Sequence, residues 1–304
     1  MEFKKEVEKD SAGEVSIEIF DNSRLYRDDQ AVAAVTSLAI EMGTIGLSQF
    51  VREEPALELF TQPFLLNFEA LVRAATDPDR EVRKVLDKAL LDRFGVRVLW
   101  MQPFGNSVFI SKGRDARTPA GISGRKVRSW AQNMNRFTEA CGGIPVVVPS
   151  SKMFQTAKDG TVDVVMTGIT SVETRELWKV LDTVTRTEHA ALEFAVVINE
   201  RVWQSLGDRH KAIITAAGRE MERTLRQTIV SIEENAYAFA RSKGMKVYDL
   251  TPNEVAEWRA CSAEVMDEFM NTAGETGRRL MEAYGKLRTD PCCSAGPKGE
   301  FTSR

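Results

Sequence analysis

Residues 125 to 168 constrain the fold more than any other stretch of this chain. They contain three short apolar runs, each flanked by turn residues and separated by helical segments: RKVRSW, PVVVP and VDVVMTG. Runs of this length predict buried strands, and crossovers through helices predict that the strands are parallel. In an open α/β sheet the ligand crevice lies at the carboxyl ends of the strands, which is where Arg128 and Thr167 fall.

Arg128 ends the first of these strands. Its planar guanidinium can donate two parallel, charge-assisted hydrogen bonds to a carboxylate. The segment therefore predicts a cleft that binds an organic anion.

Composition and charge argue against several other classes of protein. The chain has 41 basic and 44 acidic residues, a formal charge of -3, and no basic tract, so we expect no nucleic-acid partner. No apolar segment approaches the roughly 18 residues that span a bilayer, and no secretory apolar core follows Met1. Read literally, the sequence predicts a chain that neither spans a membrane nor carries an export signal.

Cysteine and histidine usage gives no sign of a cofactor or a metal site. The cysteines are Cys141, Cys261, Cys292 and Cys293, and the histidines are His189 and His210. The cysteines are too few and too scattered for a disulfide framework or a zinc site, and neither histidine has a second ligand at metal spacing. We expect incidental or structural roles for all of them.

The first third of the chain alternates predicted strands and helices, as in a βαβ unit. A helix end precedes residue 13, another helix follows Asp28 and Asp29, and a polar helical stretch reaches about Asp92. The predicted strands are 13–20, 44–50 and 96–103.

Residues 208 to 244 predict one helix of about 50 Å, because apolar residues recur at steps of three and four. Its many charges exclude a membrane span. Its apolar residues do not keep a sustained heptad, which argues against a coiled coil and favours a helix lying across two domains. A strand at 245–250 and a capping box at Thr251 to Glu254 follow, with a further helix beyond. The tail 289–304 lacks periodicity, and we expect it to be disordered.

The order of these features resembles the DctP-type solute-binding proteins of TRAP (tripartite ATP-independent periplasmic) transporters. The matching pieces, between residues 3 and 288, are EVEKDSAGEVSIEIFDNSRL, IEMGTIGLSQF, PALELFTQPFLL, GRKVRSW, GGIPVVVPSSKMFQTAKDGTVDVV, LEFAVVINERVWQSL and DLTP. The resemblance implies an α/β, two-lobed, periplasmic-binding-protein-like (type II) fold with mixed sheets, a hinge and a long helix spanning both lobes.

Chain crossings between the lobes are expected near 108–119 and 185–194. Lobe I would then comprise residues 1–108 plus about 190–225, with its N-terminal part truncated. Lobe II would comprise 109–189 plus about 226–288.

By the same resemblance, we expect the chain to be a periplasmic receptor and not an enzyme. It would capture an organic acid by its carboxylate through hinge closure. It would then deliver the acid to the small and large membrane subunits of a TRAP transporter, without a cofactor.

The resemblance also implies roles for single residues. The arginine of the family's KxR motif, which pairs with the substrate carboxylate, maps onto Arg128, and the asparagine of the family's VDGQEN maps onto Thr167. A second arginine of some relatives maps onto Val108, with Asn106 nearby, which favours a monocarboxylate or an aromatic or keto acid. Candidate apolar walls are Phe64, Phe104, Phe109, Trp130 and Trp203, and Asn199 would line the cleft or cap the helix after it.

Two features depart from the family pattern. The relatives carry a signal peptide, a first strand and most of a helix before the match to Phe3, and their C-terminal ending lacks the double cysteine. A sheet without its first strand would expose an edge.

Other readings stay open from the sequence alone. One alternative function is an enzyme on the same two-lobed scaffold, although the sequence has no Gly-x-Ser-x-Gly elbow and no phosphate loop. Its candidate acids are Glu173, Glu176 and Asp163, for which surface or turn roles are favoured. A sensory ligand-binding module and a truncated, non-functional copy are the others.

Overall fold

The computed structural model describes residues 1–291 and 293. Within them the strands form a mixed eight-stranded sheet in the order β1-β7-β2-β5-β3-β4, and β6 pairs with β2 and β8. The strands are β1 (Met42–Gly46), β2 (Val96–Ser111), β3 (Lys126–Ser129), β4 (Ile144–Val147), β5 (Val164–Gly168), β6 (Thr183–Arg186), β7 (Ala191–Asn199) and β8 (Lys246–Asp249).

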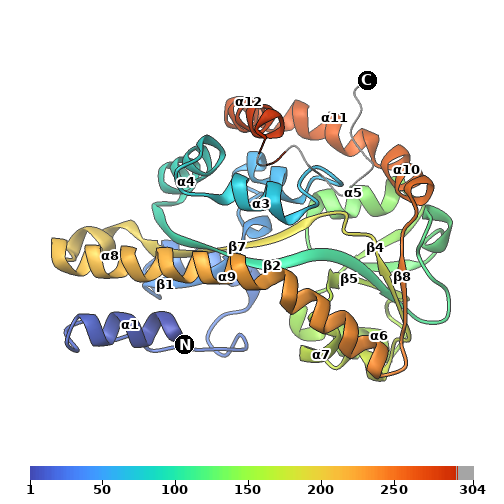
Figure 1. Cartoon of the computed structure of the whole chain (residues 1–304), viewed down its shortest axis with the longest axis horizontal. Helices are drawn as coiled ribbons and strands as arrows, with labels where there is room; N and C mark the ends of the chain where they lie inside the picture. Colours follow the sequence, from blue (N-terminus) through green and yellow to red (C-terminus); the bar gives the residue numbers. More distant parts are fainter. Residues whose placement is uncertain (292, 294–304) are drawn as a thin grey trace.

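Helices cover this sheet on both sides (Figure 1). They are α1 (Glu2–Asp10), α2 (Ala31–Thr36), α3 (Glu69–Thr76), α4 (Glu81–Phe94), α5 (Gln132–Ala140), α6 (Met153–Lys158), α7 (Ser171–Thr174), α8 (Glu200–Ser205), α9 (Asp208–Ser242), α10 (Pro252–Cys261), α11 (Ala263–Thr272) and α12 (Gly274–Thr289).

Strand β2 belongs to both lobes. Its first part pairs with β7 as far as Asn106, and its second part, from Ser107, pairs with β5 and β6. The ladder with β7 is interrupted between Pro103 and Asn106. We call the half with β1 and β7 lobe I and the half with β3, β4, β5, β6 and β8 lobe II. The strand thus changes partners before the expected crossing at 108–119, and the lobe limits given above remain a prediction.

The predicted long helix is confirmed as α9, with 35 residues. It runs along β2 across both lobes (Figure 1). Gly218 allows a close approach in lobe I, because a Cβ there would lie 2.8 Å from the Leu99 carbonyl oxygen. Further along, Tyr237 and Ala240 enter the core of lobe II. One helix therefore braces both halves.

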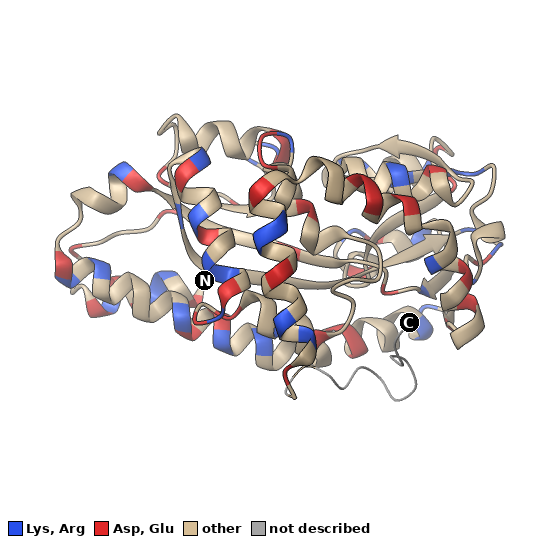
Figure 2. Ribbon diagram, turned by 90° about the horizontal axis from the view of Figure 1, so that it is seen from above, with Lys and Arg blue, Asp and Glu red and all other residues tan. Residues whose placement is uncertain are grey.

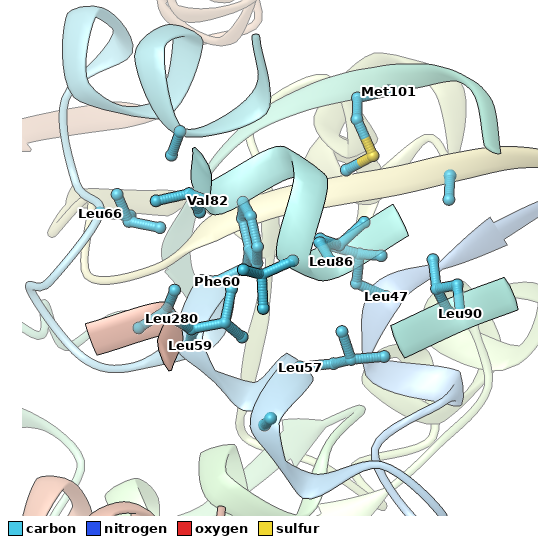
Figure 3. Packing of buried hydrophobic residues seen from close by; sticks show 14 of the residues in the cluster. Leu47, Leu57, Leu59, Phe60, Leu66, Val82, Leu86, Leu90, Met101 and Leu280 are labelled. Atoms are coloured by element: carbon cyan, nitrogen blue, oxygen red, sulfur yellow. The ribbon is translucent and has the colours of Figure 1, made fainter. Parts of the chain in front are cut away.

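The core of lobe I is built mainly from leucines, valines and alanines, with a few phenylalanines (Figure 3). The 3₁₀ helix η3 (Pro55–Thr61) provides Leu57, Leu59 and Phe60, and α4 packs Leu86 against them. Leu280 of α12 joins the same cluster, so the C-terminal helix completes lobe I. Burial of one such side chain stabilises a fold by about 1.5–3 kcal/mol.

The parallel unit predicted at 125–168 is confirmed. Strand β3 pairs in parallel with both β4 and β5, and α5 and α6 provide the crossovers. The capping box is also present: Thr251 N–H donates to Glu254 Oε2 at 2.7 Å, and Glu254 N–H donates to Thr251 Oγ1 at 3.4 Å.

The N-terminal predictions need correction. Residues 13–20 form no strand, although they alternate, and Ile19 and Phe20 are exposed. A strand requires a neighbour to pair with, and no described strand lies beside this segment. Strand β1 begins at Met42 rather than at residue 44, and α2 ends at Thr36 because the chain turns at Leu38, which has φ +65°.

One pair of cysteines has a structural role that the sequence did not specify. Cys141, at the end of α5, and Cys261, at the end of α10, form a disulfide that links segments 120 residues apart. The predicted disorder does not begin at residue 289 either, since Cys293 is buried in the core of lobe I. Residues 292 and 294–304, including Cys292, lie outside the described residues.

Basic and acidic residues are interspersed along the helices, so the ribbon shows no large face of one sign (Figure 2). Among the described residues, no helix combines the length and apolarity needed to cross a bilayer. The same residues contain no cluster of acidic, histidine or cysteine side chains suited to a metal ion.

Candidate functional site

Arg128 lies on β3, between β4 and β5, with Val146 and Val165 as its register partners. Its Nε donates to the Val148 carbonyl and its Nη1 to the Met166 carbonyl, both at 2.9 Å. The side chain is buried, at 5% exposure. The main chain of two neighbouring strands therefore holds the guanidinium in one orientation.

The charge of Arg128 has no direct partner. Among the described residues, no carboxylate lies within salt-bridge distance of it, since both of its hydrogen bonds go to carbonyl groups. Burial lowers the pKa of Arg128 to about 10; the charge of Asp28 acts in the opposite direction, and that of Arg175 adds to the lowering. A buried cation without a counter-charge is costly, and an anionic ligand would remove that cost.

The strand directions place this arginine near the crossing between the lobes. Gly168, at the end of β5, pairs with Ser107, and Gly46, at the end of β1, pairs with Phe194. Both positions lie close to the irregular part of β2. The carboxyl ends of β1 and of β3, β4 and β5 therefore face each other across the crossing, which is where ligands bind in open α/β sheets.

Two half-buried phenylalanines lie between these strand ends. The ring centroids of Phe104 and Phe194 are 5.8 Å apart. A Cβ at Gly168 would lie 2.9 Å from the Phe104 ring, and one at Gly46 would lie 3.5 Å from the Phe194 ring. Phe104 is half-buried beside these strand ends, and its role as an apolar wall stays a prediction. Phe194 was missed, because the apolar run of β7 looked like core throughout.

Thr167 shares a face of the sheet with Arg128. It is two residues beyond Val165, the register partner of Arg128, and alternate residues of a strand project from the same face. Its Oγ1 lies 3.0 Å from Ser171 Oγ, in a buried hydrogen bond. The hydroxyl can therefore still make a further hydrogen bond as a donor or acceptor.

Trp130 and Asn106 also lie near the crossing. The Trp130 ring centroid is 5.6 Å from the Arg128 guanidinium carbon, and the ring is only partly buried. The Asn106 backbone N–H donates to Glu233 at 2.8 Å. Its side-chain Oδ1 is buried and has no hydrogen-bond partner among the described residues. It is a group that a ligand or a water molecule could satisfy.

Phe109 and Phe64 belong to the core of lobe II. The expectation of a cleft wall needs correction for Phe109, which is fully buried and stacks on His189 at 4.8 Å and on Trp258 at 5.2 Å. Phe64 is buried in the same cluster, with its N–H donating to the His189 carbonyl at 2.7 Å. Burial lowers the pKa of His189 to about 3, so its ring is neutral in this apolar setting.

Asn199 and Trp203 lie far from Arg128. Asn199 pairs with Val96 at the start of β2, whereas the neighbours of Arg128 pair near Ile110, fourteen residues along the strand. At about 3.3 Å per residue, the separation is on the order of 45 Å. Asn199 caps α8 by accepting from Arg201 N–H, and Trp203 of α8 lies in the core cluster beneath α9. Neither residue lies near Arg128, and for Asn199 the alternative prediction, a cap of the following helix, is confirmed.

One polar contact that the sequence did not reveal crosses between the lobes. Ser150, in the 3₁₀ helix η5 (Ser150–Lys152) that follows β4, donates to Asp28 Oδ2 at 2.7 Å. Asp28 begins the 3₁₀ helix η1 (Asp28–Gln30), which leads through α2 into β1. The two residues are 122 positions apart in the sequence, and neither stands in a motif.

Comparisons with known proteins agree with this arrangement. The model of a family described as "Bacterial extracellular solute-binding protein, family 7" matches residues 1–273. A C4-dicarboxylate-binding periplasmic protein of Shewanella loihica is 24% identical over 90% of this chain and 81% of its own length. The 2,3-diketo-L-gulonate-binding periplasmic protein of Escherichia coli is 23% identical over 91% of this chain and 83% of its own.

Solved structures share the fold. An extracytoplasmic solute receptor of Bordetella pertussis that binds pyroglutamic acid superposes with a TM-score of 0.87 at 21% identity, covering 93% of this chain and 92% of its own. A TRAP periplasmic solute-binding protein of Sulfurospirillum deleyianum with bound succinate gives 0.84 at 23% identity, covering 92% and 91%.

Proposed function

The chain belongs to family 7 of the bacterial extracellular solute-binding proteins, and we infer that its solute is an organic acid whose carboxylate is bound by Arg128. The observation that carries this proposal is the buried guanidinium of Arg128, whose two hydrogen bonds go to carbonyl groups. A carboxylate would supply the missing charge and accept from the remaining N–H groups.

The other groups near the crossing support the same reading. Phe104 and Phe194 offer an apolar surface between the two sets of strand ends, suited to the carbon skeleton of an acid. Thr167, on the face of Arg128, offers one hydroxyl. No covalent chemistry is required of this set, and we propose a receptor rather than an enzyme.

Capture would proceed by closure of the lobes around the acid. The irregular part of β2 at 103–106 and the segment between β6 and β7 connect the lobes, and a ligand that contacts both walls favours the closed state by its differential affinity. The closed, loaded protein would then dock on the small and large membrane subunits of a TRAP transporter.

The Cys141–Cys261 disulfide supports the periplasm as the compartment. Disulfides form and persist in oxidising compartments such as the bacterial periplasm and are rare in the cytosol. The family is extracytoplasmic, so this covalent link and the family membership agree.

A thermal-shift screen tests the proposal. Mono-, di-, keto- and aromatic carboxylic acids, including pyroglutamate, succinate and orotate, are added to the full chain, and hits are titrated by calorimetry. An acid at 100 times its Kd stabilises the folded state by about 2.7 kcal/mol. Mass spectrometry of the acid after incubation distinguishes a receptor, which returns it unchanged, from an enzyme. A screen without any shift overturns the proposal.

A further inference from the structure

The two lobes carry groups of opposite charge near their crossing. Arg128 is on lobe II, and Asp28 approaches from lobe I. The Asp28 carboxylate accepts a hydrogen bond from Ser150 at 2.7 Å. Ser150 is two residues beyond Val148, whose carbonyl accepts from Arg128 Nε at 2.9 Å. This chain of contacts brings the Asp28 carboxylate close to the guanidinium without a direct ion pair.

The negative charge of Asp28 is not neutralised by its sequence neighbours. Arg27 is engaged with Asp29, through hydrogen bonds of 3.1 and 3.0 Å from its Nε and Nη2. Among the described residues, Asp28 takes part in no salt bridge. Of the acidic groups, Asp28 is the one whose charge acts on Arg128.

These positions set different demands on two groups of a ligand. One group has to be a carboxylate, because it faces the unpaired cation. A second group would lie near Asp28, whose carboxylate accepts from Ser150 and is exposed in this structure. When the lobes close and exclude water, a second carboxylate beside Asp28 would be repelled, whereas a hydrogen-bond donor would be bound.

We propose that Asp28 makes this receptor selective for acids with one carboxylate and a nearby hydrogen-bond donor, such as an amide, amino or hydroxyl group, over dicarboxylates. The inference rests on the function proposed above, since it requires that the first carboxylate is held by Arg128. Asp28 is then a specificity-determining residue of the lobe I wall.

Succinate and succinamate form a matched pair of probes, because they have the same skeleton and differ only in a carboxylate or carboxamide at one end. Calorimetric Kd values are measured for both, and for the tightest acid of the screen, with the full chain and with Asp28→Asn. We expect the unchanged protein to prefer succinamate, and Asp28→Asn to reduce the ratio of the two Kd values on the order of 10-fold.

Asp92→Asn is the control, since it removes the same charge from an exposed residue of α4 in lobe I, which pairs with Lys88. We expect it to leave the ratio unchanged. Equal affinities for the two probes in the unchanged protein overturn the proposal. An unaltered ratio in Asp28→Asn, or a screen whose tightest ligand is a dicarboxylate or lacks a donor, also overturns it.

The two proposals fail in distinguishable ways. If acids bind and Arg128→Ala weakens them, but Asp28→Asn has no effect on the ratio, only the selectivity inference is lost. If no acid binds, the proposed function is lost and the selectivity with it.

Discussion

The Glu233 carboxylate of α9 occupies the space that a side chain at residue 105 would fill. Its Oε1 accepts a 2.8 Å hydrogen bond from the Asn106 backbone N–H, and a Cβ at Gly105 would lie 2.3 Å from the same oxygen. Gly105 has φ +91°, a conformation that favours glycine. The long helix is thereby fixed to β2 at the point where the strand passes from one lobe to the other.

Gly105→Ala is expected to lower the free energy of unfolding by more than the usual cost of a left-handed alanine. The added methyl group would displace Glu233 from Asn106, in addition to a backbone cost of about 1 kcal/mol. Urea unfolding measures the change. Gly160→Ala is the control, because Gly160 has φ +75° and nothing within 4 Å of an added Cβ. Equal losses for the two variants would contradict a steric role for Glu233.

Glu233 should also make stability depend on pH. Burial raises its pKa to about 7; the Asn106 N–H and Arg186 counteract this, and the charges of Glu188 and Glu69 add to it. The folded state therefore binds a proton that the unfolded state releases between about pH 4.5 and 7, so the contribution of Glu233 to stability falls as pH rises through that window. The expected loss is on the order of 3 kcal/mol.

Glu233→Gln separates this effect from that of other groups. The amide oxygen still accepts from Asn106, but the side chain no longer titrates, so the variant should lose less stability than the unchanged protein between pH 5 and 7. Neighbouring Glu188 and Glu69, whose pKa values are also raised by burial, remain in both proteins and cancel in the comparison. Parallel curves of unfolding free energy against pH would rule out Glu233 as the cause.

Arg128→Ala should raise the Kd of the cognate acid by roughly 30-fold to several thousand-fold, from a loss of ~2 to 5 kcal/mol. Arg128→Lys should fall between the two proteins, since a lysine keeps the charge but lacks the planar fork. Calorimetry measures both. Arg209→Ala, which removes an exposed arginine paired with Glu14, serves as the control. An unchanged affinity in Arg128→Ala would remove this residue from the site.

Loss of the Cys141–Cys261 disulfide should destabilise the protein by about 2–5 kcal/mol, because the bond closes a loop of 120 residues in the unfolded chain. The double variant Cys141→Ser, Cys261→Ser should melt at a lower temperature than the oxidised protein. Reductant should lower the melting temperature of the unchanged protein but not of the variant. A melting temperature that is insensitive to reductant in both would indicate that the link adds no stability.

The parts of the fold that the sequence predicted are those with local signals. Strands β3, β4 and β5 have apolar runs between turn residues, α9 has a sustained helical period, and Thr251 with Glu254 caps a helix within four residues. Apolar and polar residues alternate equally well in 13–20, yet this segment forms no strand. Such alternation indicates which face of a strand would be buried, but not whether a neighbouring strand is present to pair with it.

The site was predicted less completely, for physical reasons. Arg128 and Thr167 lie on neighbouring parallel strands, as the sequence predicted, and their binding roles stay proposals. The contact between Asp28 and Ser150 joins positions 122 residues apart, so no local pattern marks it. Phe194 lies within an apolar run, and only the break in β2 leaves its ring half exposed beside Phe104. Trp203 and Asn199 looked like site residues because aromatic and amide side chains suit a cleft and a core equally.

The disulfide also bears on when the chain can finish folding. Cys141 emerges 120 residues before Cys261, and α9 and β8 lie between them. The two thiols cannot meet until the chain has been made as far as residue 261. The disulfide can therefore form only in chains that include the C-terminal helices. A chain that stops before residue 261 would keep a reactive thiol at Cys141, by which proteases or oxidoreductases could recognise it.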